Sequence, residues 1–207
     1  MATASCPAPS PNPSQPLSPS PQSIAPDSSV VIRTARSEDL AAITAIYNEA
    51  GVGTTASYDL EPVTVDNRRE WLERHHADGH PVLVATVDDQ VLGFAGYGVF
   101  REKAGYAHTV EHSVYVGDGA RALGVGRLLM LALVDLARGN GVHTMVGVLD
   151  ADNEASINFH RRLGFEETGR LRQVGRKFDR WLDAVLVQLM LDAPDSAPRA
   201  PLGRLRA

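Results

Sequence analysis

A short glycine-containing segment holds the residues whose types and spacing most directly suggest chemistry. Residues 121–126 read Arg-Ala-Leu-Gly-Val-Gly and lie between an expected β-strand and an expected helix. Glycines at such a junction let backbone N–H groups approach an anion closely, and the helix N-terminus adds partial positive charge. The segment therefore predicts a pyrophosphate-binding loop, with a purely structural strand-to-helix turn as the alternative.

Two regular elements flank this loop and would position it. Residues 109–116 are mostly β-branched or aromatic, and their valines alternate with residues of another kind, which indicates a strand with two different faces. From Leu128 to Leu136 apolar residues recur at helical spacing, and Gly139 follows where a C-terminal cap is expected. A strand, a glycine loop and an amphipathic helix thus form the centre of the predicted fold.

Length and composition limit the fold and exclude several functions. The chain has 207 residues, 43% of them hydrophobic, which suffices for one ordinary core but not for two large domains. The net charge is −5 and no basic run occurs, so no nucleic-acid partner is expected. No apolar stretch reaches the roughly 18 residues of a membrane-spanning helix, so we expect a soluble protein without a membrane partner. Cys6 is the only cysteine, which excludes an internal disulfide and favours the reducing cytoplasm.

Both ends of the chain differ in composition from the middle. Residues 1–28 are rich in Pro, Ser and Ala, and residues 192–207 contain three prolines and three arginines. Such segments cannot offset the entropy of ordering, and residues 1–28 lack the charged start and apolar core of a signal peptide. The sequence predicts two disordered tails around one folded domain at residues 29–191.

The periodicity of apolar residues predicts the elements of this domain. Strands are expected at 30–34, 82–87, 91–100, 109–116, 142–149, 165–170 and 181–191. Helices are expected at 38–50, at 64–76, from 128 onwards and at 154–163, with Ser37, Thr64 and Asn153 as N-caps and Gly164 as a stop. This order implies a mixed α/β sheet with helices on both faces.

Residues 121–126, together with residues 153–165 (Asn-Glu-Ala-Ser-Ile-Asn-Phe-His-Arg-Arg-Leu-Gly-Phe), resemble the GCN5-related N-acetyltransferase (GNAT) superfamily. The two stretches are similar to its acetyl-CoA-binding loop and the helix that follows. Other segments are more similar to one branch of the superfamily, the phosphinothricin and methionine sulfoximine N-acetyltransferases. These segments are residues 109–116, residues 175–183, and Ile-Tyr-Asn at 46–48 followed by Thr-Thr-Ala at 54–56. The resemblance covers about residues 30–191.

The resemblance implies a single α/β domain with a mixed, mostly antiparallel central sheet, and acetyl-CoA as the acetyl donor. In the superfamily the strand before the glycine loop diverges from its neighbour and pairs with the pantetheine arm. The residues assigned to acetyl-CoA by resemblance are Val114, Tyr115, Val116, Arg121, Leu123, Gly124, Val125, Gly126, Arg127, Asn153, Ser156 and His160. For Asn153, a helix cap alone is the alternative.

One residue departs from the family pattern. The family usually has glycine directly after the loop arginine, and this chain has Ala122. If that position required a positive φ, alanine would cost roughly 1 kcal/mol or more. We expect the loop still to bind its ligand, since two glycines remain.

Two residues are assigned to catalysis by resemblance. Glu111 corresponds to the family's general base, which receives the proton that a substrate ammonium must lose before attack. An exposed glutamate, with a pKa near 4.3, is a weak base, so the role requires surroundings that raise its pKa or a relay through water. A solvated strand glutamate is the alternative. His160 stands where many members carry a tyrosine that returns a proton to departing CoA, and mere contact with the cofactor is its alternative.

The acceptor site is also assigned by resemblance. A substrate with a carboxylate and a phosphinate or sulfoximine group requires arginine, hydroxyl and amide donors. The candidates are Thr55, Tyr58, Arg101, Tyr106, Lys177 and Trp181, with surface salt bridges and aromatic packing as the alternative roles. Family members commonly dimerise, so a homodimer is expected.

The histidines do not predict a metal site. His108 and His112 have the i,i+4 spacing that holds a metal on a helix, but on a strand it separates them by about 13 Å. That distance is too long for one ion with bonds of about 2 Å, so we predict no catalytic metal. His75 and His76 are expected at a solvated helix end.

These assignments together predict an acetyl-CoA-dependent N-acetyltransferase that acts on the α-amino group of a small amino-acid-like compound. Direct transfer is expected, because the domain contains no cysteine to carry an acetyl group. Two alternatives stay open. The first is an acetyltransferase for another amine, such as a polyamine, an antibiotic or a protein N-terminus. The second is a non-catalytic acyl-CoA-binding sensor.

Overall fold

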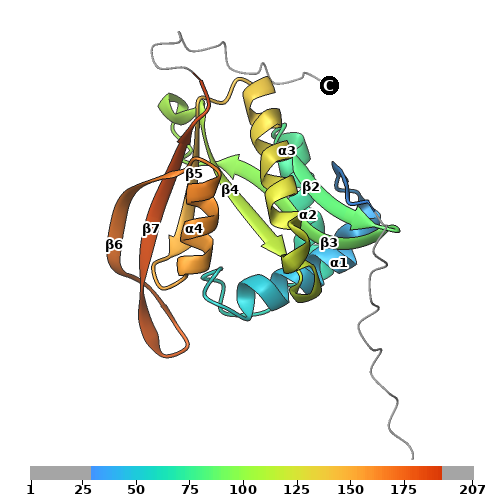
Figure 1. Ribbon diagram of the computed structural model, residues 1–207, viewed down its shortest axis with the longest axis horizontal. Helices are drawn as coiled ribbons and strands as arrows, with labels where there is room; N and C mark the ends of the chain where they lie inside the picture. Colours follow the sequence, from blue (N-terminus) through green and yellow to red (C-terminus); the bar gives the residue numbers. More distant parts are fainter. Residues whose placement is uncertain (1–28, 193–207) are drawn as a thin grey trace, which may run out of the picture.

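The computed structural model describes residues 29–192, which fold around one seven-stranded sheet (Figure 1). The predicted tails therefore lie outside the described residues, apart from Asp192. The strands are β1 (Val31–Thr34), β2 (Val82–Val87), β3 (Gln90–Val99), β4 (Thr109–Val116), β5 (Thr144–Asp150), β6 (Glu166–Lys177) and β7 (Arg180–Met190). Their order is β1-β2-β3-β4-β5-β7-β6.

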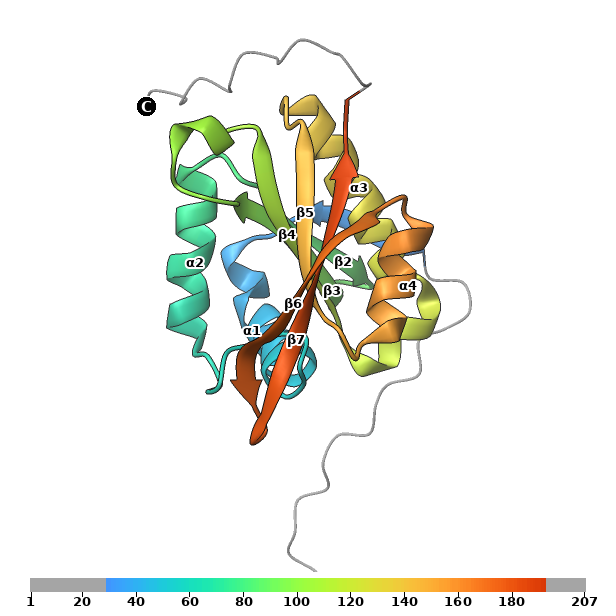
Figure 2. The same ribbon diagram turned by 90° about the vertical axis from the view of Figure 1, so that its left-hand side faces the viewer.

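All neighbouring strands are antiparallel except β4 and β5, which run parallel. Four α-helices cover the sheet: α1 (Leu40–Ile46), α2 (Val65–Ala77), α3 (Val125–Gly139) and α4 (Glu154–Arg162). Figure 2 shows α1 and α2 on one side of the sheet and α3 and α4 on the other. The predicted mixed, mostly antiparallel sheet with helices on both faces is confirmed.

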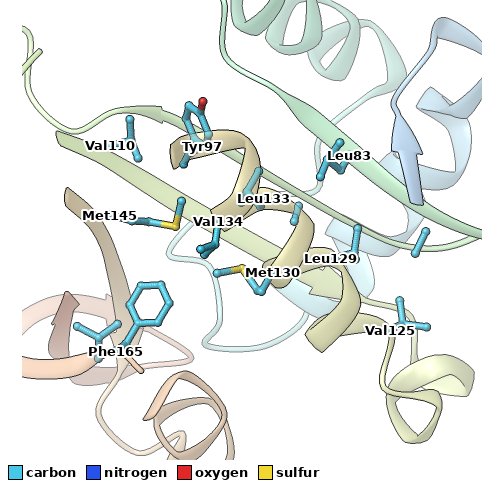
Figure 3. Packing of buried hydrophobic residues seen from close by; sticks show 14 of the residues in the cluster. Leu83, Tyr97, Val110, Val125, Leu129, Met130, Leu133, Val134, Met145 and Phe165 are labelled. Atoms are coloured by element: carbon cyan, nitrogen blue, oxygen red, sulfur yellow. The ribbon is translucent and has the colours of Figure 1, made fainter. Parts of the chain in front are cut away.

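Helix α3 supplies much of the core on its side of the sheet. Its residues Leu129, Met130 and Leu133 are completely buried and, with Val110 of β4 and Met145 of β5, belong to one cluster (Figure 3). Each such side chain contributes about 1.5–3 kcal/mol by leaving water. This packing holds α3 against β2, β3 and β4, so that the first turn of α3 has a fixed place beside the end of β4.

The first helix differs from its prediction at both ends. Ser37 is not the N-cap, because residues Ser37–Asp39 form a 3-10 turn in which the Asp39 carboxylate accepts from the Arg36 N–H at 2.7 Å. After α1 the chain widens into a π-helical turn, Tyr47–Val52. Gly53 closes this turn, and a Cβ there would lie 2.7 Å from the Glu49 carbonyl oxygen. Apolar periodicity does not distinguish such a turn from ordinary helix.

Two other boundaries also differ. Helix α3 begins at Val125 rather than Leu128, and it ends at Gly139 with the positive φ on Gly141. Strand β6 continues past the predicted end at Arg170 as far as Lys177. Most of its residues are exposed, so the strand has no buried face and no apolar alternation to predict it. Within residues 29–192, no helix is long and apolar enough to span a membrane.

A partly buried ion pair fixes the turn before α1 to β1. The Arg33 guanidinium donates two hydrogen bonds to the Asp39 carboxylate, at 2.7 and 2.8 Å, and Asp39 is 4% exposed. Burial alone would raise the pKa of Asp39, but the hydrogen bonds from Arg33 and from the Arg36 N–H outweigh it, and the pKa is lowered. The ionised carboxylate therefore stabilises the fold.

We predict that Asp39→Asn lowers the free energy of unfolding by about 2–3 kcal/mol, less than for a fully buried pair because Arg33 is partly solvated. Since the folded pKa is the lower one, the stabilisation is complete above the ordinary aspartate pKa and disappears as the pH falls through the folded value. Urea unfolding from pH 3 to pH 7 measures both effects. Glu38→Gln, at an exposed neighbouring carboxylate, is the control. Equal stability of the two variants at pH 7 would contradict the prediction.

Candidate active site

Strands β4 and β5 are paired over only part of their length. The parallel pairing covers three residue pairs and ends with Glu111 opposite Val146. Beyond this point β4 stays paired with β3 as far as Val116, while β5 stays paired with β7 as far as Asp150, so the two strands diverge (Figure 1). Among the described strands, the facing edges have no partner there, and their N–H and C=O groups are available to a ligand.

A cavity of about 70 Å³ lies between the diverging strands. Its walls come from β4, β5, α4 with its N-cap, and Ala56 of the loop after the π-helical turn. They include five residues assigned to acetyl-CoA, namely Val114, Tyr115, Asn153, Ser156 and His160. Asn153 also caps α4, because its Oδ1 accepts from the Ser156 N–H at 3.0 Å, so the two predicted roles of Asn153 are compatible.

The aromatic ring of Tyr115 points away from the gap between β4 and β5. The ring packs on the other face of the sheet, 5.1 Å from the Tyr47 ring and 5.4 Å from the Phe94 ring. Only the main chain of Tyr115 is therefore suited to a ligand between β4 and β5.

The glycine loop has the geometry that an anion site requires. A 3-10 segment, Asp118–Leu123, leads to Gly124, whose φ of 71° is left-handed. The first N–H groups of α3, at Val125 and Gly126, have no partner within the helix. A Cβ on Gly126 would lie 3.4 Å from Val116 Cγ2, so this turn lies against the end of β4.

The side chains around the loop are mostly turned to solvent. Leu123 and Arg127 are exposed, and Arg121 forms an exposed ion pair with Asp118 at 2.9 Å. Val125 is the exception, because its side chain is completely buried in the core. The backbone of Ala122 belongs to the right-handed 3-10 segment, and the left-handed conformation falls on Gly124, so the expected cost of alanine does not arise.

A second cavity, of about 380 Å³, lies on the other face of β4. Glu111 lines it together with His75 of α2 and with Phe100 and Arg101 from the segment after β3. Gly98, the cross-strand partner of Glu111, leaves the wall beside the carboxylate without a side chain. This hollow is large enough for a small amine.

The surroundings of Glu111 suit a proton acceptor. Burial raises the pKa of Glu111, and the positive charge of Arg101 partly offsets this. The Arg101 guanidinium lies 4.5 Å from the centre of the Phe100 ring, and the Tyr106 ring lies 5.8 Å from the same ring. Arg101 and Tyr106 therefore gather beside the cavity that contains Glu111.

Lys177 lies outside this cavity. It is 4% exposed, and its Nζ donates to the carbonyl oxygens of Thr54 and Ser57, both at 2.7 Å. Burial lowers the pKa of Lys177. The ammonium group of Lys177 thus links the segment after the π-helical turn to the end of β6 by hydrogen bonds.

The other three acceptor-site candidates are also apart from Glu111. Thr55 donates a hydrogen bond to Asp150 at the end of β5, and the Tyr58 hydroxyl donates to the Asp183 carbonyl oxygen at 3.3 Å. Trp181 is 60% exposed on β7. In a single chain, therefore, Arg101 is the one candidate of the six that lines the cavity of Glu111, and Tyr106 approaches it only through its contact with the Phe100 ring.

His160 is buried beside the gap between β4 and β5, and its hydrogen bond defines its tautomer. Its Nδ1 lies 2.8 Å from the Ser156 carbonyl oxygen, which only accepts, so Nδ1 carries the hydrogen. In the neutral ring Nε2 is therefore an acceptor, and it is buried without a partner in the described part of the chain. Burial lowers the pKa of His160, partly opposed by the bond to Ser156, which favours this neutral form.

His112 stacks on His160, with ring centres 5.1 Å apart. Burial, with a smaller contribution from His160, lowers the pKa of His112 to about 3. Neither ring nitrogen has a partner among residues 29–192. Gly147 leaves the room for this ring, because a Cβ there would lie 2.7 Å from His112 Nε2.

Sequence reasoning missed two residues of these cavities. His112 lies between Val110 and Val114, and strand alternation alone places it on their apolar face. His75 and His76 are both in the last turn of α2, as predicted, and His76 is exposed. The predicted solvation is wrong for His75, because its ring packs 4.4 Å from the Trp71 ring one turn earlier and is turned toward the sheet. The i,i+4 spacing of Trp71 and His75 indicates that the two rings lie on the same face of the helix, and this spacing could have predicted the position of His75.

The described residues contain no group of three His, Cys, Asp or Glu side chains placed to hold a metal ion. His108 instead has its Nδ1 3.2 Å from the Gly141 carbonyl oxygen. The absence of a catalytic metal stays a prediction.

Comparison with known proteins agrees with this geometry. The model of the acetyltransferase (GNAT) domain family matches residues 32–186. The L-methionine sulfoximine/L-methionine sulfone acetyltransferase of Pseudomonas aeruginosa is 48% identical over 171 residues, which cover 82% of this chain and 99% of the relative. The phosphinothricin N-acetyltransferase of Streptomyces coelicolor is 38% identical over 157 residues, which cover 74% of this chain and 92% of that protein.

A solved structure has the same fold. It is a putative acetyltransferase from Salmonella typhimurium with its cofactor acetyl-CoA, and it superposes with a TM-score of 0.79 at 44% identity. The match covers 83% of this chain and 98% of that one. The diverging strands, the glycine loop and these relatives lead to one conclusion: the chain belongs to the GNAT family of acetyltransferases, which use acetyl-CoA, and it is an N-acetyltransferase.

Proposed function

We propose that this N-acetyltransferase acetylates the α-amino group of a small amino-acid-like compound, such as methionine sulfoximine, methionine sulfone or phosphinothricin. The observation that carries the proposal is the position of Glu111, in a half-buried cavity where β4 and β5 stop pairing, with Arg101 beside it. A carboxylate for the amine proton and a cation for the substrate carboxylate are what an α-amino acid requires. The names of the two curated relatives support this class of acceptor.

Glu111 is the proposed general base. Its carboxylate accepts a proton from the acceptor ammonium, directly or through one water molecule, and the neutral nitrogen attacks the thioester carbon. A C–N bond forms, the C–S bond breaks, and the thiolate leaves with the electron pair. The acylated nitrogen loses its second proton to solvent, which leaves the neutral amide. Residues 29–192 contain no cysteine that could carry the acetyl group between two steps, in agreement with direct transfer.

The gap between β4 and β5 is the proposed acetyl-CoA site. The unpaired main chain of Val114 and Val116 is available to the pantetheine amides, and the first N–H groups of α3 are available to the pyrophosphate. The left-handed Gly124 and the close approach of Gly126 to β4 support this assignment. The acceptor enters from the opposite face of β4, where Glu111 lies.

His160 is proposed as a contact of the acetyl donor rather than as the acid that protonates the thiolate. The bond from Nδ1 to Ser156 leaves Nε2 without a hydrogen in the neutral ring, and burial disfavours the charged ring. A neutral His160 can therefore accept a hydrogen bond in the gap but cannot donate one there. The thiolate takes its proton from solvent.

We further propose that the enzyme is a cytoplasmic homodimer. The hairpin of β6 and β7 exposes large apolar side chains that a second copy could cover, namely Leu171, Val174, Phe178 and Trp181. Gly175 of the same hairpin packs against the Tyr58 ring. A partner on this surface would therefore lie next to the loop that contains Thr55 and Tyr58. In such a dimer, Thr55 and Tyr58 could contribute to an acceptor site built from two chains.

The function is tested by measuring thiol release from acetyl-CoA with a panel of acceptors. The panel contains methionine sulfoximine, methionine sulfone, phosphinothricin, free amino acids, spermidine and a short peptide with a free N-terminus. We expect the highest kcat/KM with the first three. Preference for spermidine or the peptide would identify another acceptor class, and tight acetyl-CoA binding without turnover would identify a sensor.

We predict that Glu111→Gln lowers kcat/KM by about 10²–10⁴-fold, the usual contribution of a general base. A base acts only when deprotonated, so the wild-type rate should fall as the pH drops through the raised pKa of Glu111. This acid limb should disappear in the variant. Glu73→Gln, at an exposed carboxylate of α2, is the control. Unchanged kinetics in Glu111→Gln would refute the assignment.

For His160→Asn we predict a several-fold rise in the KM for acetyl-CoA and a change in kcat smaller than tenfold. The asparagine amide can still donate to the Ser156 carbonyl oxygen but offers no basic nitrogen in the position of Nε2. Steady-state kinetics with acetyl-CoA varied at saturating acceptor measures both parameters. A fall in kcat of about 10²-fold or more at unchanged KM would instead indicate proton transfer by His160.

A further inference from the structure

The cavity of Glu111 contains a second titratable side chain, His75 of α2, which the proposed mechanism does not use. A Cβ built on Gly98 would lie 3.6 Å from His75 Nε2. Gly98 is directly opposite Glu111 in the antiparallel pair of β3 and β4, and residues in this relation point to the same face with Cβ positions about 5 Å apart. His75 Nε2 therefore lies above bare backbone, directly beside the position of the Glu111 side chain.

The orientation of the His75 ring is fixed. Its Nδ1 lies 2.9 Å from the Trp71 carbonyl oxygen, which only accepts, so Nδ1 carries the hydrogen. The neutral ring therefore presents the Nε2 lone pair to the cavity. The ring also packs 4.4 Å from the Trp71 ring, and its centre is 6.3 Å from that of His80.

The charges around His75 leave it able to take up and release a proton. Burial lowers the pKa of His75, with smaller effects from His80 and Arg74, while the bond to Trp71 and the charge of Asp78 raise it. Across the cavity are Glu111, whose pKa is raised, and Arg101, whereas the side chains of Tyr97 and His112 lie on the opposite face of the sheet. The proton affinities of Glu111 and His75 are thus shifted in directions that bring them closer together.

We propose that His75 Nε2 receives the proton that Glu111 has removed from the acceptor amine and passes it to solvent. This inference rests on the proposed function. The amine proton binds first to the Glu111 carboxylate, and the carboxyl O–H then gives it to Nε2, directly or through one water. The imidazolium keeps its bond to the Trp71 carbonyl and loses the Nε2 proton to water or buffer. Glu111 is then ionised for the next turnover, and His75 acts through it as a positioning and relay residue.

The test is chemical rescue of His75→Ala by imidazole. We expect kcat to fall on the order of tenfold or more, within the range for a lost proton-transfer group, and to recover as imidazole is added at constant pH and ionic strength. His76→Ala is the matched control, because His76 is exposed on the same turn, and its kcat should neither fall nor respond to imidazole. Acetyl-CoA affinity and Tm, measured in parallel, report whether His75→Ala is folded.

A second variant covers the case in which His75→Ala does not fold. Gly98→Ala adds one methyl group at an ordinary contact distance from Nε2, so the sheet should accept it. We expect the methyl group to obstruct transfer between Glu111 and His75, with a lower kcat at unchanged acetyl-CoA affinity.

The outcomes separate the two proposals. If the wild-type enzyme releases no thiol with any acceptor, the proposed function fails. If the wild type turns over but imidazole does not rescue folded His75→Ala, or only the KM for the acceptor changes, the relay is wrong. Unchanged kcat in Gly98→Ala would also overturn it.

Discussion

The short parallel pairing of β4 with β5 is the constraint on which the rest of the site depends. Parallel neighbours need a crossover connection, and α3 provides it, so the end of β4 leads directly into the glycine loop and the first turn of this helix. Each of the two strands is held on its outer edge by an antiparallel partner. They can therefore diverge after Glu111 without leaving the sheet, and the unpaired edge and the helix N-terminus face the same gap.

In the proposed mechanism, β4 also separates the acceptor from the acetyl donor, because successive side chains of a strand point to opposite faces of the sheet. Glu111 lines the larger cavity on the side of α2, whereas the next residue, His112, stacks on His160 on the side of α4. The main chain of the following residues lines the gap between them. A single strand thus presents a titratable carboxylate to one cavity and backbone groups to the other, and the reacting atoms would meet where the strands part.

The sequence predicted those features that depend on interactions between residues close together in the chain. The strand at residues 109–116, the caps at Thr64 and Asn153, and the helix after the glycine loop follow from alternation, hydrogen-bonding side chains and helical spacing. The roles of Lys177 and His75 could not be predicted in this way. Lys177 bonds to two carbonyls more than a hundred residues earlier in the chain. His75 lines the same cavity as Glu111 because β3 places Gly98, which has no side chain, opposite Glu111. Such long-range contacts leave no periodic signal.

The bond from Lys177 to the loop has a consequence for how acceptor preference can change during evolution. The ammonium group binds the carbonyl oxygens of Thr54 and Ser57, and these atoms are present whatever side chains the loop carries. Residues on this loop can therefore be exchanged while its path over the ends of β5 and β6 is retained. In the proposed acceptor site built from two chains, selection for a new substrate could therefore act on the side chains of the loop alone, because Lys177 holds the loop through its main chain.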